Sequence, residues 1–383
     1  MYLDPIYPGP NNVRRIIKRD KMRIKKAFGC SLLAACAGVG AQSMTVYGLV
    51  DTAVEHITNA GGKGTLTRMP SLAGGSFPSR IGFRGTEDLG SSIRAVFALE
   101  QGFAPDTGAL NQGGRAFGRQ AYAGLASPWG TLTFGRQYTM LFWGVLETDL
   151  IGPANFGTGS LDSYLPNARA DNALAYRGTF NGFTLGATYS FGRDTVNAGP
   201  SPAGTNCAGE RSGDSKACQE WSAMIKYDTD NFGGALVYDL LRGGPGAFAG
   251  LTSSKLKDQR TLANLYVKFN GFKVAGGLIR RDNDGSATTP RSDLWYGAVS
   301  YSLATWTFDG ELLRLKFKGS SNAANMGVVR ATYNLSKQTA VYAMAGRIIN
   351  KSGSAISLSA QPGGSPLSGQ GQSGFTTGIR HTF

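Results

Sequence analysis

The stretch SRIGFRGTEDLGSSIRAVFALE, residues 79–100, contains two alternating runs on either side of the turn-forming segment 87–90. Side chains along a β-strand point alternately to its two faces, so Ile81 and Phe83 share one face while Arg80 and Arg84 share the other. The run after the turn repeats this arrangement with an apolar set made of Ile93, Ala95, Phe97 and Leu99. The stretch therefore predicts a β-hairpin with one apolar face and one face that carries charge.

Comparable alternating segments continue to the end of the chain, and together they predict sixteen β-strands. The composition agrees, because 55 glycines, 10% aromatic residues and only 17% charged residues favour many strands joined by turns. No uninterrupted apolar run approaches the roughly 18 residues that indicate a transmembrane helix. The predicted strands are 44–55, 78–88, 91–103, 118–127, 130–138, 171–179, 182–192, 220–229, 232–242, 260–270, 272–282, 290–301, 305–317, 323–334, 339–350 and 373–383.

The segments between these strands alternate between short turns and long stretches rich in Gly, Ser and Asn. Seven short turns and eight long loops are the connections that an up-and-down barrel with its turns on one rim requires. A soluble β-sandwich would bury the apolar face, and for a single strand this alternative fits as well. A ring of sixteen strands is too wide for side chains to fill, so its polar face lines water and its apolar face meets lipid. The predicted fold is all-β, a transmembrane 16-stranded antiparallel up-and-down β-barrel.

The N-terminal region has the pattern of an export signal. Basic residues within 23–26 precede an apolar run over 27–40, and the small residues 39–41 fit a signal-peptidase site. We expect a signal peptide over 22–41 and a mature barrel domain over 42–383. Residues 1–21 do not resemble the start of a signal, which indicates that Met22 is the true start and 1–21 an extension from a start codon assigned too early. Residues 33–36 also fit a lipoprotein cleavage box, which leaves lipidation of Cys36 as an alternative.

Removal of residues 1–41, which hold eight Lys/Arg and two Asp/Glu, lowers the formal net charge from +14 to +8. The remaining basic residues are spaced along the predicted strands and form no nucleic-acid-binding module, so no nucleic-acid partner is expected. Fixed positive charge along the inside of the barrel is the better interpretation.

Two cysteines remain after export, Cys207 and Cys218, in a segment rich in Gly, Pro and Ser. An oxidising compartment would permit them to form a disulfide, which we predict. Their spacing lacks companion ligands and the chain has only two histidines, so neither a metal site nor a cofactor is expected.

Four segments carry a family resemblance: QSMTVYGLVD (42–51), SRIGFRGTEDLG (79–90), FGRQ (134–137) and GIRHTF (378–383). In this order, across nearly the whole mature length, they resemble the trimeric general porins of Gram-negative bacteria, of the β-proteobacterial and neisserial type. The resemblance implies a homotrimer in the outer membrane whose third extracellular loop folds into the pore as a constriction. It also implies passive diffusion of small hydrophilic solutes and ions. Residues 140–170 fall where this loop should be.

The resemblance further implies which residues line the constriction. The basic residues of the barrel wall would be Arg80, Arg119 and Arg169, with Arg136 as a fourth candidate. The acidic candidates of the loop are Glu147, Asp149, Asp162 and Asp171. A guanidinium fixed in a narrow passage concentrates anions, so a weak preference for anions is expected. The alternative is that each arginine pairs with a neighbouring acid and only positions the loop.

The last predicted strand, 373–383, ends on an apolar residue, whereas chain termini are usually polar and frayed. Closing the ring requires this strand to pair with the first one, and alternation then places Phe375, Ile379 and Phe383 toward lipid. The resemblance adds that a terminal aromatic residue is the mark by which the outer-membrane assembly machinery recognises its barrels. Outer-membrane lipid and lipopolysaccharide are the other expected partners.

A substrate-selective channel is one alternative to a general diffusion channel, and two other classes of protein compete with both. An enzyme on a barrel scaffold needs a positioned base and nucleophile. His56 ends the first predicted strand and His381 lies on the lipid side of the last, and no acid or serine constellation converges on either. A secreted adhesin or lectin would stay in the soluble fraction. The sequence therefore predicts a channel rather than an enzyme.

Overall fold

The computed structural model describes residues 43–62, 64–71, 75–152, 155–194 and 205–383. The predicted extension (1–21) and the predicted signal peptide (22–41) lie outside the described residues, as does Cys36. Within the described ranges, no helix is long and apolar enough to cross a membrane.

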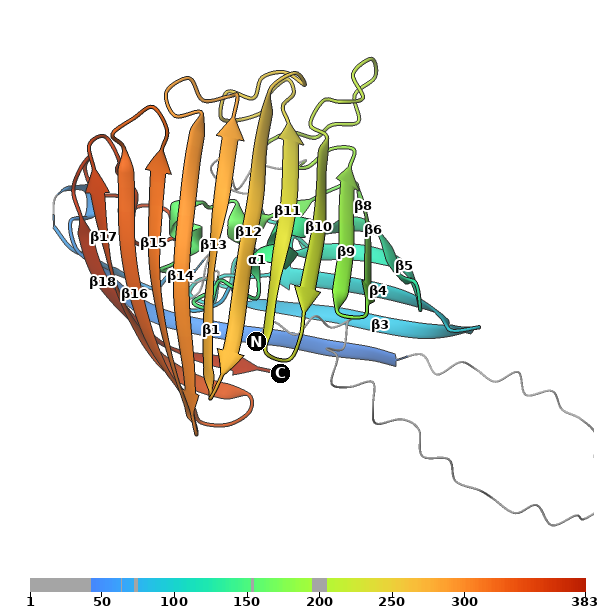
Figure 1. Ribbon diagram of the computed structural model, residues 1–383, viewed down its shortest axis with the longest axis horizontal. Helices are drawn as coiled ribbons and strands as arrows, with labels where there is room; N and C mark the ends of the chain where they lie inside the picture. The colour runs from blue at the N-terminus through green and yellow to red at the C-terminus, as the bar shows by residue number, and fades with distance from the viewer. Residues whose placement is uncertain (1–42, 63, 72–74, 153–154, 195–204) are drawn as a thin grey trace, which may run out of the picture.

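Sixteen antiparallel strands form one closed ring, as predicted (Figure 1). Consecutive strands of the ring are hydrogen-bonded neighbours, and β1 also pairs with β18. Two further strands, β2 (Leu66–Arg68) and β7 (Arg169–Ala170), are short and pair with β1 and β6. The ring strands are β1 (Ser43–Ile57), β3 (Arg80–Gly90), β4 (Ile93–Gly102), β5 (Gln120–Ser127), β6 (Gly130–Tyr138), β8 (Ala173–Phe180), β9 (Phe183–Ser190), β10 (Glu220–Asp228), β11 (Phe232–Arg242), β12 (Lys257–Phe269), β13 (Phe272–Asn283), β14 (Arg291–Leu303), β15 (Trp306–Phe317), β16 (Ala323–Asn334), β17 (Thr339–Lys351) and β18 (Gln372–Thr382).

The ring closes between the first and last strands, which confirms the prediction made for the end of the chain. The pairing of β1 with β18 runs from Leu49 opposite Thr382 to Ile57 opposite Gly374. Phe383 continues this pairing, since its N–H donates to the Gly48 carbonyl at 3.1 Å and its own carbonyl accepts from Gly48 at 2.9 Å. Its ring is 46% exposed on the outer wall. The last residue is therefore held in the sheet.

The seven predicted turns join strands at one rim, and the eight long connections leave the strands at the opposite rim; the loops between β9 and β17 are at the top of Figure 1. Two of the turns are Asn-Gly pairs: φ is 50° at Asn181 and 85° at Gly182, and 46° at Asn270 and 81° at Gly271. Positive φ at both central residues is what a two-residue hairpin turn needs to match the twist of its strands, and Asn and Gly tolerate it best. We call the two rims the turn side and the loop side.

The outer wall of the barrel is apolar, as predicted for a surface that meets lipid. Large apolar side chains are widely exposed there, for example Leu312 (73%), Leu265 (63%) and Val329 (61%). The inner wall is not uniformly polar, because buried apolar residues also project inward, among them Leu262 and Met344. They pack with apolar residues of the long segment between β6 and β8, which covers this part of the inner wall.

Candidate functional site

Strand β6 separates from β8 at Gly135, whose φ of 126° is favourable only for glycine, while it stays paired with β5 as far as Arg136. Its pairing with β8 ends at Phe134, and the following residues pair with β7 instead, with Tyr138 opposite Arg169. The chain thus turns into the barrel at Tyr138 and returns at Arg169. We call the segment between them, residues 139–168, the inner loop.

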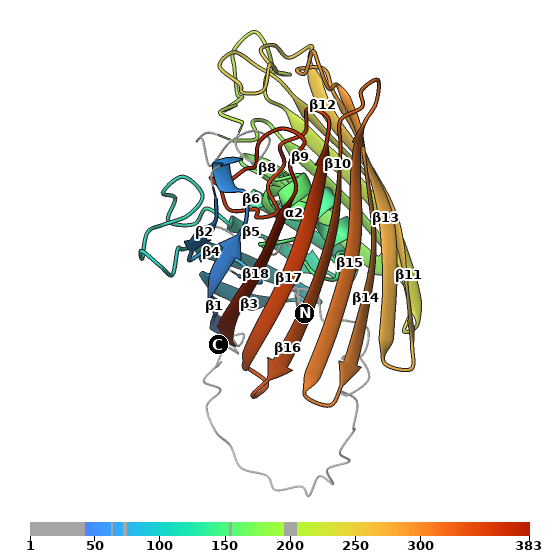
Figure 2. The same cartoon turned by 90° about the vertical axis from the view of Figure 1, so that its left-hand side faces the viewer.

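The inner loop crosses the interior of the barrel from one wall to another. Its first helix, α1 (Met140–Val145), contacts β10, β11 and β12, and its second, α2 (Thr158–Leu161), follows after the crossing. On the far side, Arg330 of β16 donates hydrogen bonds to the carbonyls of Leu150 at 3.0 Å and Ile151 at 2.7 Å. Figures 1 and 2 show the green helices of this segment inside the ring of strands. The inner loop therefore narrows the lumen.

The structure brings three of the predicted wall arginines together around Tyr138 and Glu100. Arg119 and Arg169 both donate to the Tyr138 hydroxyl, at 2.7 and 2.9 Å. Arg119 forms an ion pair with Glu100 at 2.7 Å, and Arg80 approaches the same carboxylate at 3.6 Å. We call Arg80, Arg119 and Arg169 the arginine cluster. Arg80 and Arg119 share the Glu100 carboxylate, and Arg169 joins them through the Tyr138 hydroxyl, so three permanently charged guanidiniums lie close together.

The members of the arginine cluster differ in exposure. Arg119 is 1% exposed and Arg169 3%, whereas the Arg80 side chain retains 14%. Tyr47 also donates to Glu100, at 3.0 Å, so this carboxylate is held from two strands besides its own. Arg119 and Glu100 thus form a buried ion pair within the cluster, and Arg80 is the most exposed of its three arginines.

Arg136 does not join the arginine cluster. It lies where β6 leaves the wall, donating to the Gly118 carbonyl at 2.7 Å and to Asp171 at 2.5 Å. Arg115 binds the same Asp171 at 3.0 Å and Asp194 at 2.7 Å. Two arginines and two aspartates balance in this group, so we interpret Arg136 as a tether for the ends of the inner loop.

Of the four acidic candidates, only Asp171 contacts a predicted wall arginine. Glu147 pairs with Lys273 of β13 at 2.7 Å, and Asp162 pairs with Arg260 of β12 at 2.8 Å. The loop acids face β12 and β13 because α1 carries this part of the chain along that wall. The expected arrangement of loop acids opposite the arginines is therefore not what the structure shows for these two residues.

The surroundings of the loop acids shift their pKa values in opposite directions. Burial raises the pKa of Asp149 above its ordinary value, and hydrogen bonds from the Thr158 hydroxyl and the Gly152 N–H offset only part of this effect. Burial also raises the pKa of Glu147, but the ammonium of Lys273 outweighs it and holds that pKa below the ordinary value. Glu147 is thus the more firmly ionised of the two.

The tie between Glu147 and Lys273 is expected to weaken in acid. A carboxyl whose pKa is lowered on folding stabilises the fold above its unfolded pKa, and this contribution disappears as the pH falls through the folded pKa, which lies below the ordinary value of a glutamate. We expect the conductance of the wild type to change on acidification through this range as the inner loop loosens. Glu147→Gln should already show the altered conductance at neutral pH; the same acid response in this variant would exclude Glu147 as its cause.

Tyr164 anchors the returning part of the inner loop, just before the 3-10 helix η3 (Leu165–Asn167). Its ring lies between the guanidiniums of Arg193 and Arg260, at 4.7 and 4.4 Å from its centre. Its hydroxyl donates to Glu220 and, at 3.1 Å, to Asp239. Burial and these two carboxylates raise the pKa of Tyr164 well above its ordinary value, which keeps the hydroxyl as a donor.

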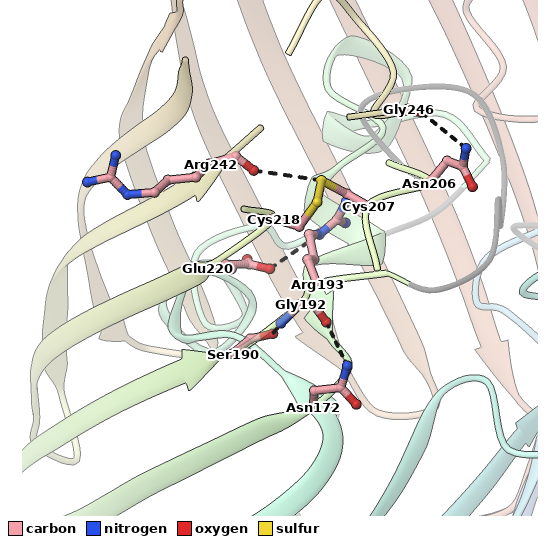
Figure 3. The surroundings of a disulfide bond; sticks show 10 residues. All are labelled: Asn172, Ser190, Gly192, Arg193, Asn206, Cys207, Cys218, Glu220, Arg242 and Gly246. Atoms are coloured by element: carbon pink, nitrogen blue, oxygen red, sulfur yellow. Dashed lines mark hydrogen bonds and ion pairs between the residues drawn. A yellow bond between two sulfur atoms is a disulfide. The ribbon is translucent and has the colours of Figure 1, made fainter. Parts of the chain in front are cut away.

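A disulfide lies beside Arg193 (Figure 3), one of the two arginines that contact the Tyr164 ring. Cys207 and Cys218 are bonded, and the carbonyl of Cys218 accepts from the N–H of Arg193 at 3.1 Å. The Arg193 guanidinium in turn pairs with Glu220 at 3.3 Å. Sequence reasoning predicted the disulfide but not its position beside Arg193, a residue of the loop after β9.

Replacement of both cysteines by serine is expected to lower the free energy of unfolding by on the order of 2 to 3 kcal/mol, because the bridge closes a loop with a sequence separation of 11. Thermal denaturation with and without a reductant would measure the loss, and reductant should then have no effect on the double variant. Peptide mapping under non-reducing conditions that finds two free thiols in the wild type would contradict the bridge itself.

A cavity of about 790 Å³ opens between the inner loop and the turn-side part of the inner wall. Basic residues from four strands line it: Lys268, Lys273, Arg330 and Arg380. Within the described residues, no carboxylate lies within 4 Å of the charged groups of Lys268 or Arg380, and Arg380 lies over the Phe77 ring at 5.0 Å. Sequence reasoning missed these residues, although alternation with outward-facing neighbours marks their positions as inward.

The described part of the chain contains no group of three or more His, Cys, Asp or Glu residues placed to hold a metal ion. Both histidines contact threonine hydroxyls, His56 with Thr67 at 2.8 Å and His381 with Thr339 at 2.9 Å. Neither of these contacts joins the histidine to an acid or to a serine.

Comparisons with known proteins agree with this architecture. The family model described as Gram-negative porin matches residues 29–353. An outer membrane porin protein of Bordetella pertussis is 36% identical over 193 residues, which cover 45% of this chain and 50% of that protein. Outer membrane porin protein 32 of Delftia acidovorans is 28% identical over 94% of this chain and 99% of its own length. Among solved structures, the anion-selective porin from Comamonas acidovorans superposes with a TM-score of 0.72 at 21% identity, over 90% of this chain and all of that chain.

Proposed function

Since the chain belongs to the Gram-negative porin family, we propose that it forms a water-filled outer-membrane channel for small hydrophilic solutes and ions, with a weak preference for anions. The inner loop narrows the lumen, and the arginine cluster, which lies where the inner loop leaves and rejoins the wall, would supply fixed positive charge near this constriction. A positive potential between low-dielectric walls raises the local concentration of anions and the barrier for cations.

The observation that carries the anion preference is the grouping of Arg80, Arg119 and Arg169 around Tyr138 and Glu100. Arg80 and Arg119 contact Glu100 and Arg169 contacts Tyr138, while Glu147 and Asp162 of the inner loop are paired with Lys273 and Arg260. Lys268 and Arg380 of the turn-side cavity, which form no ion pair within 4 Å among the described residues, add to the same potential. The name of the Comamonas structure, an anion-selective porin, supports the same proposal.

Assembly as a homotrimer is part of the proposal, and so is recognition of the C-terminal Phe383 by the outer-membrane assembly machinery. A trimer would place part of the apolar outer wall against neighbouring copies. Cross-linking of the folded protein, and gel mobility before and after boiling, would test it: only monomers before boiling would contradict the trimer.

A substrate-selective channel is the second candidate, and the turn-side cavity favours it. Basic residues of this cavity face Glu147 and Asp149 of the inner loop, an arrangement that could bind one class of anion more tightly than others. A general channel would instead pass different anions of one size at similar rates.

Uptake into proteoliposomes would test the proposed function. Small anionic, neutral and cationic solutes of matched size should all enter, with the anion fastest and the cation slowest. Saturation of the flux by one anion that blocks the others would favour the substrate-selective channel. No flux into vesicles that contain folded, inserted protein would overturn the proposal.

A further inference from the structure

A buried carboxyl group, that of Glu311 on β15, lies in the barrel wall beneath the inner loop. Its side chain occupies an inward position of the strand, and the residue is only 2% exposed. Among the described residues, no donor forms a hydrogen bond with either of its carboxylate oxygens. The residues directly opposite on the adjacent strands are Ala298 of β14 and Val328 of β16, whose side chains have no donor to offer.

Two contacts fix the inner loop on either side of Glu311. On β14, the Tyr296 hydroxyl is hydrogen-bonded to the Thr148 hydroxyl at 2.7 Å, and on β16, Arg330 donates to the Ile151 carbonyl at 2.7 Å. The register places Tyr296 one inward position from Glu311 toward the loop side, and Arg330 one inward position from it toward the turn side. Figure 2 shows these three strands side by side. The inner-loop residues between the two contacts therefore cross β15 over Glu311.

The charged groups around Glu311 include more acids than bases. Asp149 of the inner loop and Asp309 of β15 repel a negative charge on Glu311, whereas Arg330 of β16 attracts it. Arg330 is already paired with Asp309 at 2.8 Å. Tyr296 of β14 is the other titratable group nearby, and its hydroxyl is bonded to the inner loop. Glu311 thus belongs to a group of three acids and one arginine.

Glu311 differs from the facing Asp149 in what its oxygens bind. Asp149 accepts hydrogen bonds from the Thr158 hydroxyl at 2.6 Å and from the Gly152 N–H at 2.9 Å, and such bonds favour an ionised carboxylate. Glu311 accepts none from the described residues, and an ionised carboxylate that is buried without a donor is very unfavourable. Glu311 is therefore the acid that holds a proton while the inner loop covers it.

We propose that Glu311 is a proton-binding site that keeps the inner loop seated on β14, β15 and β16, and that loss of this proton at alkaline pH releases the loop. With the loop seated, the carboxyl is buried and neutral. With the loop displaced, the carboxyl faces the water of the lumen, gives its proton to that water and becomes a carboxylate.

The direction of the pH dependence follows from the number of protons bound. The seated state binds one proton more than the released state, so a rise in pH favours release. For one proton, the ratio of released to seated loop rises by up to about tenfold per pH unit. This alkaline response is separate from the acid response expected for Glu147.

Planar-bilayer recording and hydrogen exchange of the folded mature protein test the proposal, from neutral pH to an alkaline pH below the range in which tyrosines ionise. The variant E311Q keeps the shape of the neutral carboxyl but cannot ionise. The variant E87Q makes the same change at an exposed position of β3 and is the matched control. Amide exchange in the inner loop is compared between proteins at equal pH, so the intrinsic pH dependence of exchange cancels.

We expect the mean conductance of the wild type and of E87Q to rise toward alkaline pH, and that of E311Q to stay constant. At the alkaline end, the inner loop of the wild type should exchange about tenfold faster than that of E311Q. Asp149→Asn removes the facing negative charge and should weaken the response. An equal alkaline response in E311Q and the wild type, or no response in the wild type, would overturn the proposal.

The conductance measurement rests on the proposed channel function, whereas hydrogen exchange does not. Faster exchange that depends on Glu311, in folded and inserted protein that carries no current, would refute the channel and support the proton site. Current through the wild type and E311Q with the same conductance and the same exchange at every pH would support the channel and refute the proton site.

Discussion

Replacement of the arginine cluster by glutamine, in the variant R80Q/R119Q/R169Q/E100Q, is expected to lower the anion-to-cation permeability ratio at least about threefold. Glu100 is replaced as well because it would otherwise remain buried without its partner Arg119. The variant removes two net positive charges from the lumen. One charge about 4 Å from a passing ion contributes about 1 kcal/mol even at the dielectric constant of water, which is roughly a fivefold effect on local ion concentration. Reversal potentials in a KCl gradient across a planar bilayer measure the ratio.

Two control variants distinguish the effect of charge in the arginine cluster from an effect on folding and from the effect of charge elsewhere on the barrel. The variant R119Q/E100Q removes one buried ion pair without changing the net charge, so its permeability ratio should stay near that of the wild type. The variant R314Q/R347Q removes two positive charges from the outer wall and should also leave the ratio unchanged. An unchanged permeability ratio in the cluster variant would show that other residues determine the ion preference. Lys268 and Arg380 of the turn-side cavity would then be the next candidates.

Tyr164→Ala is expected to release the returning part of the inner loop. The substitution removes a ring that is held between Arg193 and Arg260, and it leaves the carboxylates of Glu220 and Asp239 without the hydroxyl that binds both. Loss of a buried aromatic ring costs about 3 to 5 kcal/mol. We expect a lower midpoint of thermal unfolding and single-channel currents that are larger and noisier than those of the wild type.

Tyr164→Phe is the matched control. It keeps the ring between the two guanidiniums and loses only the hydroxyl, so the stability loss should be about 1 to 3 kcal/mol. Its mean conductance should stay near that of the wild type because the inner loop remains in place. If a folded Tyr164→Ala channel conducts with the amplitude and noise of the wild type, Tyr164 is not the anchor of the inner loop.

The ring of strands could be predicted from the sequence because each strand has one face toward lipid, which keeps the alternation strict. The predicted strand ends were less accurate where charged residues interrupt the apolar alternation. The strand expected at 260–270 begins earlier, at Lys257, because the inward Asp258 pairs with Arg281 at 2.8 Å and with Arg260 at 3.3 Å. The two- and three-residue strands β7 and β2 have no pattern of their own and depend on neighbours brought together by the fold.

The candidate site could be predicted only in part. Family resemblance pointed to Arg80, Arg119 and Arg169, which the structure brings together at Tyr138 and Glu100. The partners of the loop acids could not be predicted, because the path of the inner loop depends on how α1 packs against β10, β11 and β12. The pair formed by Asp162 and Arg260 joins residues 98 positions apart, and alternation along single strands carries no information about such a contact.

The reversal potential of the wild-type channel in a KCl gradient tests the central proposal most directly. A positively charged constriction predicts stepwise channel openings whose reversal potential is displaced toward the equilibrium potential of chloride. A reversal potential displaced toward that of potassium, recorded from folded and inserted protein, would contradict an arginine-lined, anion-preferring pore.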